Sequence, residues 1–267
     1  MMKKIIVLFN GINAPWHITT FAINIAKQND AEVHALFLRD EKISNPYPSD
    51  IKSAQTNFPG DNEENSDEQL EEKNIQLFKT FCDDEKVKCS FERDVSLKKF
   101  VELSAAADCI VTDSHDDFRK YSLKDILAEI RCPICLISIN ATKIKIAILL
   151  YDGSDDALLA IKTYSNLFPK LCKKKTYLVT VNEKEKIKRK QRESIYQKLE
   201  KRFSDLEMVS LTGKVERELL EFLDDHTENA IVVMGAYGRS TISLLFKPSL
   251  SNVVLNQSRT SLFIAHD

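Results

Sequence analysis

Short apolar runs alternate along this chain with longer segments in which apolar residues recur every three or four positions. The runs are rich in β-branched residues, and the first of them is Lys4 to Asn10. Such runs are typical of buried strands, whereas the three-to-four spacing is typical of amphipathic helices. The alternation predicts an α/β fold in which strand–helix units form parallel sheets.

The pattern is clearest in the second half of the chain. It predicts, in order, strand 144–151, helix 155–168, strand 176–181, a helix over about 186–203, short strand 207–210, helix 215–225, strand 230–234, helix 249–256 and strand 261–265. The first half follows the same order with weaker signals.

The helix predicted over Asp155 to Phe168 shows the signals on which these assignments depend. Its apolar positions fall on one stripe, made of Ala157, Leu158, Ile161, Tyr164 and Phe168. Ser154 stands where an N-cap is expected. Asp155 and Asp156 fill the first turn, where the helix dipole favours acidic residues.

The chain repeats itself once. Three pairs of segments match: 4–10 with 145–152, 109–114 with 230–235, and 130–138 with 258–266. The repeated unit is about half of the 267 residues, which is the size of a domain. The repeat therefore predicts two tandem doubly wound parallel-sheet domains, one over residues 1–140 and one over residues 144–267.

Two stretches interrupt the symmetry of the halves. Asp40 to Glu72 contains three prolines and an acidic run, so it is predicted to be a solvated insertion in the first domain. The linker Asn140 to Lys143 is short, so the two domains are expected to pack against each other.

The composition limits the classes of partner. The 38 Lys and Arg residues nearly balance the 40 Asp and Glu residues, so no overall charge attracts nucleic acid or a membrane surface. The apolar part of the first run, Ile5 to Phe9, is too short for a signal peptide or a membrane span. We therefore expect a cytoplasmic protein, with its six cysteines as free thiols.

A glycine-containing segment follows the strand predicted over 230–234. It holds Gly235, Gly238 and Arg239, and Ser249 comes soon after. Glycine allows a positive φ and a close approach of the backbone to a ligand, and amide groups at the start of a helix bind phosphate. The segment matches neither the dinucleotide motif nor the P-loop motif. A tight turn with no ligand explains it equally well.

A second polar segment, Asp152-Gly153-Ser154, ends the first strand of the same half. Neighbouring parallel strands end on one side of a sheet, so this segment is expected to lie beside Gly235. The Asp152 carboxylate is an acceptor for a base or a ribose. The alternative is that the segment only caps the following helix.

Together these residues resemble the universal stress protein family in its tandem form. The matching features are an apolar first strand ending in Asp-Gly-Ser, a later strand ending in Met-Gly, and the spacing G-x2-G-x9 from Gly235. The resemblance covers both halves and implies a fold like that of the adenine nucleotide α-hydrolases.

The resemblance also implies a site for ATP or another adenine nucleotide in the second half. It would be formed by Asp152, Gly153, Val181, Met234, Gly235, Gly238, Arg239 and Ser249. We expect no metal other than Mg²⁺ carried with the nucleotide. Pro248 replaces the third glycine of the family motif and has no N–H group, which leaves weak binding and no binding both open.

The first half departs further from this motif. Asn10 stands in place of the aspartate, and Ser114 and Asp117 stand in place of the two glycines. Asp113 and Asp116 add negative charge where phosphate would lie. We therefore expect no ATP in this half.

Two other motifs have ordinary explanations. Cys132 and Cys135 are spaced as in a redox or zinc motif, but they enter a strand, on which residues three apart face opposite sides. Lys184 to Arg192 holds six basic residues and is expected to be the solvated face of a helix.

The leading hypothesis is a non-enzymatic regulatory protein with an internal pseudo-dimer, formed by pairing of the two final strands, 133–138 and 262–265. The first alternative is slow ATP hydrolysis, although no nucleophile or general base is apparent beside the glycine segment. The second is an interaction scaffold that binds an unknown protein partner through the acidic insertion. Association of two such chains into a homodimer stays open.

Overall fold

The structure is a computed structural model. It describes residues 2–10, 14–38, 63–114, 123–139, 143–181, 189–226, 229–235 and 260–265. Within these residues, no helix combines the length and the apolar character that are needed to cross a membrane.

Strands and helices alternate along both halves, as the sequence predicts. The first half contains β1 (Lys4–Asn10), α1 (Trp16–Asn29), β2 (Glu32–Leu38), α2 (Glu63–Asp84), β3 (Cys89–Val95), α3 (Leu97–Ser104), β4 (Cys109–Asp113), α4 (Leu123–Glu129) and β5 (Ile134–Ile137). The second half contains β6 (Ile146–Leu150), α5 (Asp155–Leu167), a 3-10 turn at Leu171–Lys173, β7 (Lys175–Val181), α6 (Arg189–Leu199), β8 (Asp205–Leu211), α7 (Val215–Asp225), β9 (Ala230–Gly235) and β10 (Ser261–Ala265).

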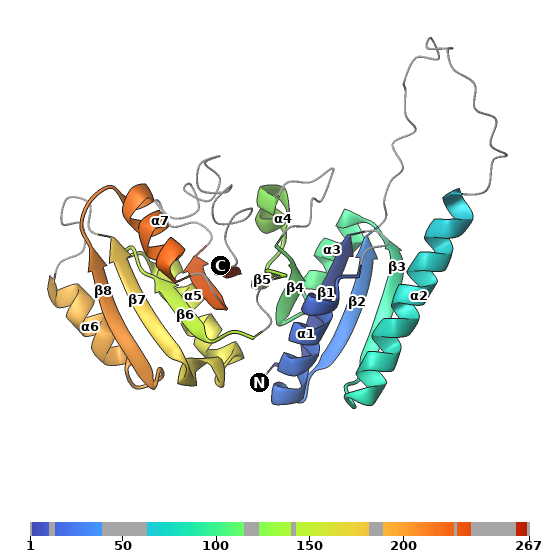
Figure 1. The fold of residues 1–267 in the computed structure, drawn as a ribbon, viewed down its shortest axis with the longest axis horizontal. Coiled ribbons are helices and arrows are strands. Elements are labelled where there is room, and N and C mark those ends of the chain that lie inside the picture. Colours follow the sequence, from blue (N-terminus) through green and yellow to red (C-terminus); the bar gives the residue numbers. More distant parts are fainter. Residues whose placement is uncertain are drawn as a thin grey trace, which may run out of the picture.

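The strands of the described residues join one ten-stranded sheet in the order β3-β2-β1-β4-β5-β10-β9-β6-β7-β8. Within each half every pair of neighbouring strands is parallel. Reading from the two ends inward, both halves have the same order of strands, with β1 and β6 in equivalent places. The predicted α/β class and doubly wound parallel arrangement are therefore confirmed, with the two sheets continuous (Figure 1).

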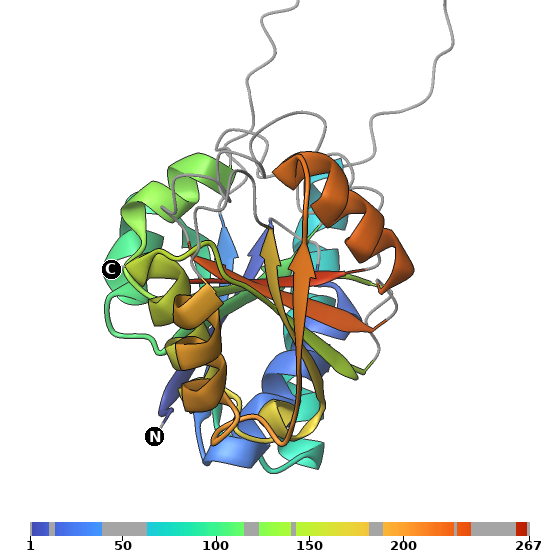
Figure 2. The same ribbon diagram turned by 90° about the vertical axis from the view of Figure 1, so that its left-hand side faces the viewer.

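The two halves meet through their final strands, which pair antiparallel. Leu136 lies opposite Leu262, and Ile134 lies opposite Ile264. The sheet is strongly twisted, as is usual for long sheets. In Figure 2 the arrows of β1 and β2 (blue) point to the same side as those of β7 and β8 (yellow and orange). The carboxyl ends of these strands in both halves therefore face one side of the molecule.

Helices cover both faces of the sheet. One face carries α1, α2, α5 and α6, and its core contains rings from both halves. The Tyr164 and Phe263 rings are 5.4 Å apart, and the Phe168 ring lies 6.4 Å from that of Phe21 on α1. The other face is covered by α3, α4 and α7. Because Phe21 and Phe168 come from different halves, apolar packing reinforces the strand pairing.

Several predicted boundaries are shifted. Helix α2 begins at Glu63, so residues 63–72 of the predicted insertion belong to a helix. Helix α6 ends at Leu199 rather than near Phe203. The helix predicted over 249–256 lies outside the described residues. The predicted cap of α5 is confirmed, because the Ser154 hydroxyl accepts a hydrogen bond from the Ala157 amide at 3.1 Å.

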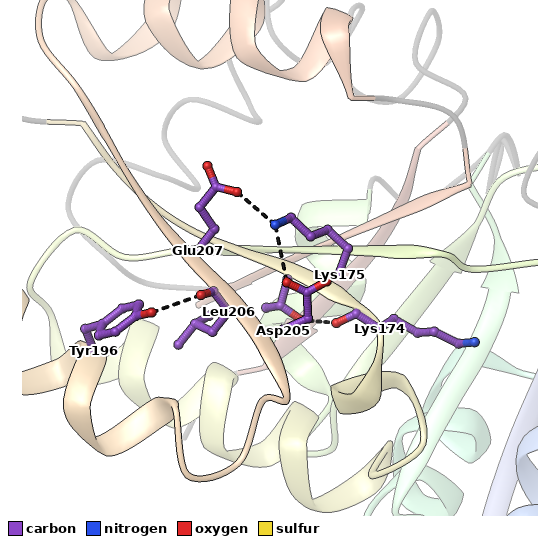
Figure 3. Close-up of polar contacts among 7 residues, drawn as sticks. Lys174, Lys175, Tyr196, Asp205, Leu206 and Glu207 are labelled. Atoms are coloured by element: carbon purple, nitrogen blue, oxygen red, sulfur yellow. Dashed lines mark hydrogen bonds and ion pairs between the residues drawn. The ribbon is translucent and has the colours of Figure 1, made fainter.

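Strand β8 forms one edge of the sheet and is held there by side chains on both sides (Figure 3). The Lys175 ammonium group contacts Asp205 Oδ1 at 3.3 Å and Glu207 Oε2 at 2.8 Å. From α6, the Tyr196 hydroxyl donates to the Leu206 carbonyl at 3.0 Å. Charged residues of this kind discourage unwanted strand pairing at a sheet edge.

Two buried tyrosines of the second half allow a matched test of the core. The Tyr164 hydroxyl has no hydrogen-bond partner among the described residues, whereas the Tyr151 hydroxyl accepts a hydrogen bond from Gln191 at 3.2 Å. An unpaired buried hydroxyl costs stability, and a paired one contributes to it. We predict that Tyr164→Phe leaves the free energy of unfolding unchanged or raises it by up to about 1 kcal/mol.

The matched variant Tyr151→Phe should lower the free energy of unfolding by about 1 kcal/mol. Urea denaturation of both variants measures the difference. A loss of stability in Tyr164→Phe equal to that in Tyr151→Phe would show that the Tyr164 hydroxyl is paired.

Candidate functional site

The candidate site lies at the carboxyl ends of β6 and β9 in the second half. These two strands are neighbours and parallel, with Leu149 opposite Val233. The chain leaves β6 for α5 and β7 on one side, while β9 continues to β10 on the other side. Such a switch point leaves a crevice beyond the strand ends, and ligands bind there in open α/β sheets.

The segment after β6 forms a tight turn whose centre is the Asp152 carboxylate. Its Oδ1 atom accepts hydrogen bonds from the Ser154 amide at 3.0 Å and from the Ser154 hydroxyl at 2.5 Å. Gly153 between them has φ of 88°, which a residue with a side chain rarely adopts. Asp152 is therefore placed at the crevice, and this same carboxylate orders the start of α5.

Gly235 has a packing role that the sequence does not suggest. Its φ is not in the positive range, which among the described glycines is reached by Gly153 and Gly213. Instead, a Cβ atom on Gly235 would lie 2.8 Å from the Asp156 carbonyl oxygen and 2.9 Å from the Ala157 nitrogen. The glycine is needed because the first turn of α5 packs directly on the end of β9. The expected positive φ at this position is wrong.

The other predicted site residues divide into two groups. Met234 precedes Gly235 on β9 and is buried in the core on the α7 side, and Val181 ends β7, the neighbour of β6. The structure thus places Asp152 and Gly153 just after β6 and Met234 and Gly235 at the end of its neighbour β9, with Val181 one strand further. Gly238, Arg239 and Ser249 lie outside the described residues, as does Pro248.

Tyr151 is a residue near the site that sequence reasoning missed. It follows β6, its side chain is buried, and its hydroxyl accepts a hydrogen bond from Gln191 of α6. It therefore links the strand that carries Asp152 to α6. Its sequence position directly before the Asp-Gly-Ser segment is the signal that could have identified it.

The equivalent strand ends of the first half carry a histidine–aspartate pair. By strand register, Asp113 on β4 corresponds to Gly235 on β9, where the sequence match places Ser114, and its carboxylate lies 3.2 Å from the Nε2 atom of His17 on α1. The same nitrogen lies 3.1 Å from the Ile137 carbonyl at the end of β5. Both side chains are nearly buried. Sequence reasoning identified Asp113 here but missed His17, which is 96 residues earlier in the chain.

The two cysteines of the C-x-x-C motif lie on opposite faces of the sheet, and the Cys135 sulfur instead lies 3.6 Å from that of Cys109. Cys132 lies in the core on one face of the sheet and Cys135 in the core on the other, as predicted for positions three apart in a strand. Burial raises the pKa of the Cys132 thiol, which disfavours the reactive thiolate. No cluster of three or more potential metal ligands occurs within the described part of the chain.

Of the basic run Lys184 to Arg192, the structure describes Arg189 onward. Arg189 bonds Glu193 on the same helix at 2.7 Å, and Arg192 donates to the Ser210 hydroxyl of β8 at 3.0 Å. Arg189 is exposed to solvent and Arg192 is partly exposed. These contacts agree with the solvated helix face that the sequence predicts.

The packing of Gly235 generates a prediction that does not involve a ligand. Because the added methyl group would meet backbone atoms that cannot rotate away, Gly235→Ala should lower the free energy of unfolding by about 1–3 kcal/mol. Chemical denaturation in nucleotide-free buffer measures this change. Ser154→Ala, which removes the α5 cap, provides a reference loss of about 1 kcal/mol. Wild-type stability for Gly235→Ala would contradict the close packing.

Comparison with known proteins places this geometry in context. No protein-family model matches the sequence, and no curated protein matches it. The structure is similar to that of a universal stress protein from Archaeoglobus fulgidus DSM 4304, with a TM-score of 0.64 and 11% sequence identity, covering 98% of this chain and 96% of the other.

Two structures from Pseudomonas aeruginosa are similar to the same degree. One is a functionally unknown protein from strain PAO1, with a TM-score of 0.63, 11% identity, and coverage of 99% of this chain and 92% of that one. The other is assigned to the universal stress proteins and comes from strain UCBPP-PA14, with a TM-score of 0.62, 11% identity, and coverage of 99% and 93%. The chain therefore has the fold of the universal stress proteins over nearly its whole length.

Proposed function

We propose that this protein is a universal-stress-type regulatory protein that binds ATP or another adenine nucleotide weakly in the crevice of its second half. The observation that carries the proposal is the difference between two equivalent crevices. In the second half the strand ends hold Gly235 and the Asp152 turn, whereas in the first half the buried pair of His17 and Asp113 lies at that place. The fold supports the regulatory class of function.

The second-half crevice has groups suited to the nucleoside part of the ligand. The Asp152 carboxylate follows the end of β6, and the neighbouring strand β9 ends in Met234 and Gly235. Carboxylates and backbone groups hydrogen-bond ribose hydroxyls and base amines. The phosphates, with any Mg²⁺ they carry, would contact Gly238, Arg239 and Ser249, and the arginine would supply positive charge. Pro248 removes one amide donor, in keeping with weak binding.

The first-half crevice is poorly suited to a nucleotide. Asp113 places a carboxylate near the position of the ligand, and negative charge there repels phosphate. Displacing His17 would leave that carboxylate buried without its neighbouring imidazole, which is energetically costly. We therefore propose one nucleotide for each chain.

We propose further that the protein binds the nucleotide without hydrolysing it. Regulation requires binding alone, and no group among the described residues at the crevice is arranged as an activated nucleophile or general base. Measuring phosphate release from ATP distinguishes the two possibilities. Release that falls in Gly238→Ala would support the enzyme alternative, and release at the rate of buffer would support the binder.

The scaffold alternative is favoured by one observation. Asp152, which would contact the nucleoside, already bonds Ser154 in the structure. If both crevices take no nucleotide, the acidic insertion becomes the main candidate for a partner surface. Removing residues 40–62 leaves α2 complete, so pull-down with this deletion tests the insertion alone.

A conservative substitution at Asp152 tests the proposed function directly. Asp152→Asn keeps an oxygen that accepts the Ser154 hydrogen bonds, but it removes the negative charge that would bind the nucleoside. We predict that the affinity for ATP, measured by isothermal titration calorimetry, falls about tenfold or more, because a hydrogen bond to a charged group contributes roughly 1.5–3 kcal/mol.

Asp155→Asn is the matched control, because it makes the same charge change at an exposed position in the first turn of α5. It should leave the affinity within about twofold of wild type, since surface charges interact weakly. Equal losses in the two variants would indicate a general charge effect. Absence of binding heat in the wild type would reject the proposal in favour of a scaffold.

A further inference from the structure

A serine, a histidine and a glutamate form a hydrogen-bonded row across β2 and β3. The Nδ1 atom of His34 lies 2.6 Å from the Ser90 hydroxyl, and its Nε2 atom lies 3.3 Å from Glu92 Oε1. The row lies near the beginning of both strands, away from the crevices at their carboxyl ends. It is independent of the proposed nucleotide site.

The register of the sheet brings these three residues together. Ser90 lies opposite His34, and Glu92 lies opposite Leu36 on the same strand pair. Side chains two apart on a strand face the same side, so Ser90 and Glu92 both flank the imidazole. The serine is 56 residues from the histidine in the sequence, which is why the sequence alone did not reveal the row.

The chemistry of the three groups fixes the direction of each hydrogen bond. A carboxylate only accepts, so the His34 Nε2 atom carries a proton and donates it to Glu92. In a neutral imidazole the Nδ1 atom is then an acceptor, and the Ser90 hydroxyl donates to it. Burial, with a smaller contribution from the charge of Lys4, lowers the pKa of His34 against the opposing effects of Glu92 and Glu32. The imidazole is therefore neutral at pH 7.

The three side chains differ in solvent exposure, and the serine, whose hydroxyl would react, is exposed. The His34 side chain is 8% exposed and that of Glu92 is 40% exposed, while Ser90 is exposed to solvent. A buried imidazole thus accepts the proton of an accessible hydroxyl. A base held in place by a carboxylate and bonded to a hydroxyl is the arrangement that activates a serine nucleophile.

Strand β3 also offers an amide group beside Ser90. It is an edge strand of the described sheet, with β2 as its neighbour. The Val33 amide donates to the Lys88 carbonyl, so residues 88 and 90 direct their backbone groups toward β2. The alternation of a strand then directs the Phe91 amide toward the open edge. An amide next to a nucleophile can stabilise the negative oxygen that forms during acyl transfer.

We propose that Ser90 is a nucleophile toward small activated acyl esters. The Ser90 oxygen would attack the ester carbonyl carbon while its proton passes to His34 Nδ1. The tetrahedral intermediate would then release the alcohol, which takes that proton back from His34, and leave an ester on Ser90. Attack by water, with His34 again accepting and returning a proton, would release the carboxylic acid and restore the serine. No oxidant, metal or cofactor enters these steps.

The same hydrogen bonds would also serve a purely structural role, in which they pair the nitrogens of a buried imidazole. Measuring the reactivity of Ser90 distinguishes this structural role from a catalytic one. We would treat the full chain with 4-nitrophenyl acetate, follow nitrophenolate release, and map the acetylated residue by peptide mass spectrometry. We expect acetyl-Ser90, formed roughly 10²–10⁴ times faster than acetylation of an unassisted serine. Ser204, which is exposed, is the internal reference, and Ser204→Ala should leave the rate unchanged.

Two variants and a pH profile complete the test. Ser90→Ala should abolish the site-specific acetylation, and Glu92→Gln should slow it about tenfold or more, because the imidazole loses its orienting carboxylate. Since the base acts when neutral, the rate at Ser90 should rise with pH below 6.5 and then level. Thermal unfolding confirms that each variant is folded.

Acetylation confined to lysines, or a rate at Ser90 no greater than that at Ser204, would overturn the proposal. A rate at Ser90 that is unaffected by Glu92→Gln and that increases steadily with pH would also overturn it. In each of these cases the row would be a structural network that satisfies His34.

Discussion

The antiparallel pairing of β5 with β10 is the constraint on which the rest of the structure depends. Each half alone would be a five-stranded sheet with an exposed, apolar final strand, and such an edge is prone to uncontrolled association. Pairing Ile134 with Ile264 and Leu136 with Leu262 removes both edges at once. The Phe21 and Phe168 rings then bring helices of both halves together over the junction. In Figure 2 the arrows of β1, β2, β7 and β8 point the same way, so the carboxyl ends of these strands lie on one side of the molecule.

The two copies of the repeat share this frame but have diverged where their strands end. In the second copy, α5 begins with a side-chain cap and packs on Gly235. In the first half, α1 begins after Pro15 without such a cap, and Asp113 takes the place of the glycine. The buried pair of Asp113 and His17 belongs to the first copy alone. The two halves therefore share one arrangement of strands while the residues at their strand ends differ in chemistry.

Much of the fold was predictable because its signals are local. Apolar runs such as the one that ends before Asp152 predict the strands, and capping residues such as Ser154 predict where helices begin. The internal repeat predicts that the two halves have the same order of strands. Helix boundaries that depend on tertiary packing were harder to predict from the sequence. Residues 63–72 are acidic and appear solvated in the sequence, yet they continue the helix whose buried face begins at Ile75.

The sequence predicted where the candidate site lies, but it predicted only some of the contacts that hold its residues in place. The sequence identified Gly235 as a position that requires glycine. The cause is that the backbone of α5 leaves no room for a side chain there, and no local sequence pattern reveals this contact. The same limit applies to His17 beside Asp113 and to His34 between Ser90 and Glu92. These partners are separated by tens of residues, so only the strand order brings them into contact.

The central claim is that one crevice of this pseudo-symmetric chain binds adenine nucleotide and the other does not. Photolabelling of the full chain with 8-azido-ATP, followed by peptide mapping, tests it most directly. If the second half holds the nucleotide, labelled peptides will come from residues 144–267 and will disappear in the presence of excess ATP. Labelling of residues 2–139 to the same extent, or labelling that excess ATP does not prevent, would contradict it.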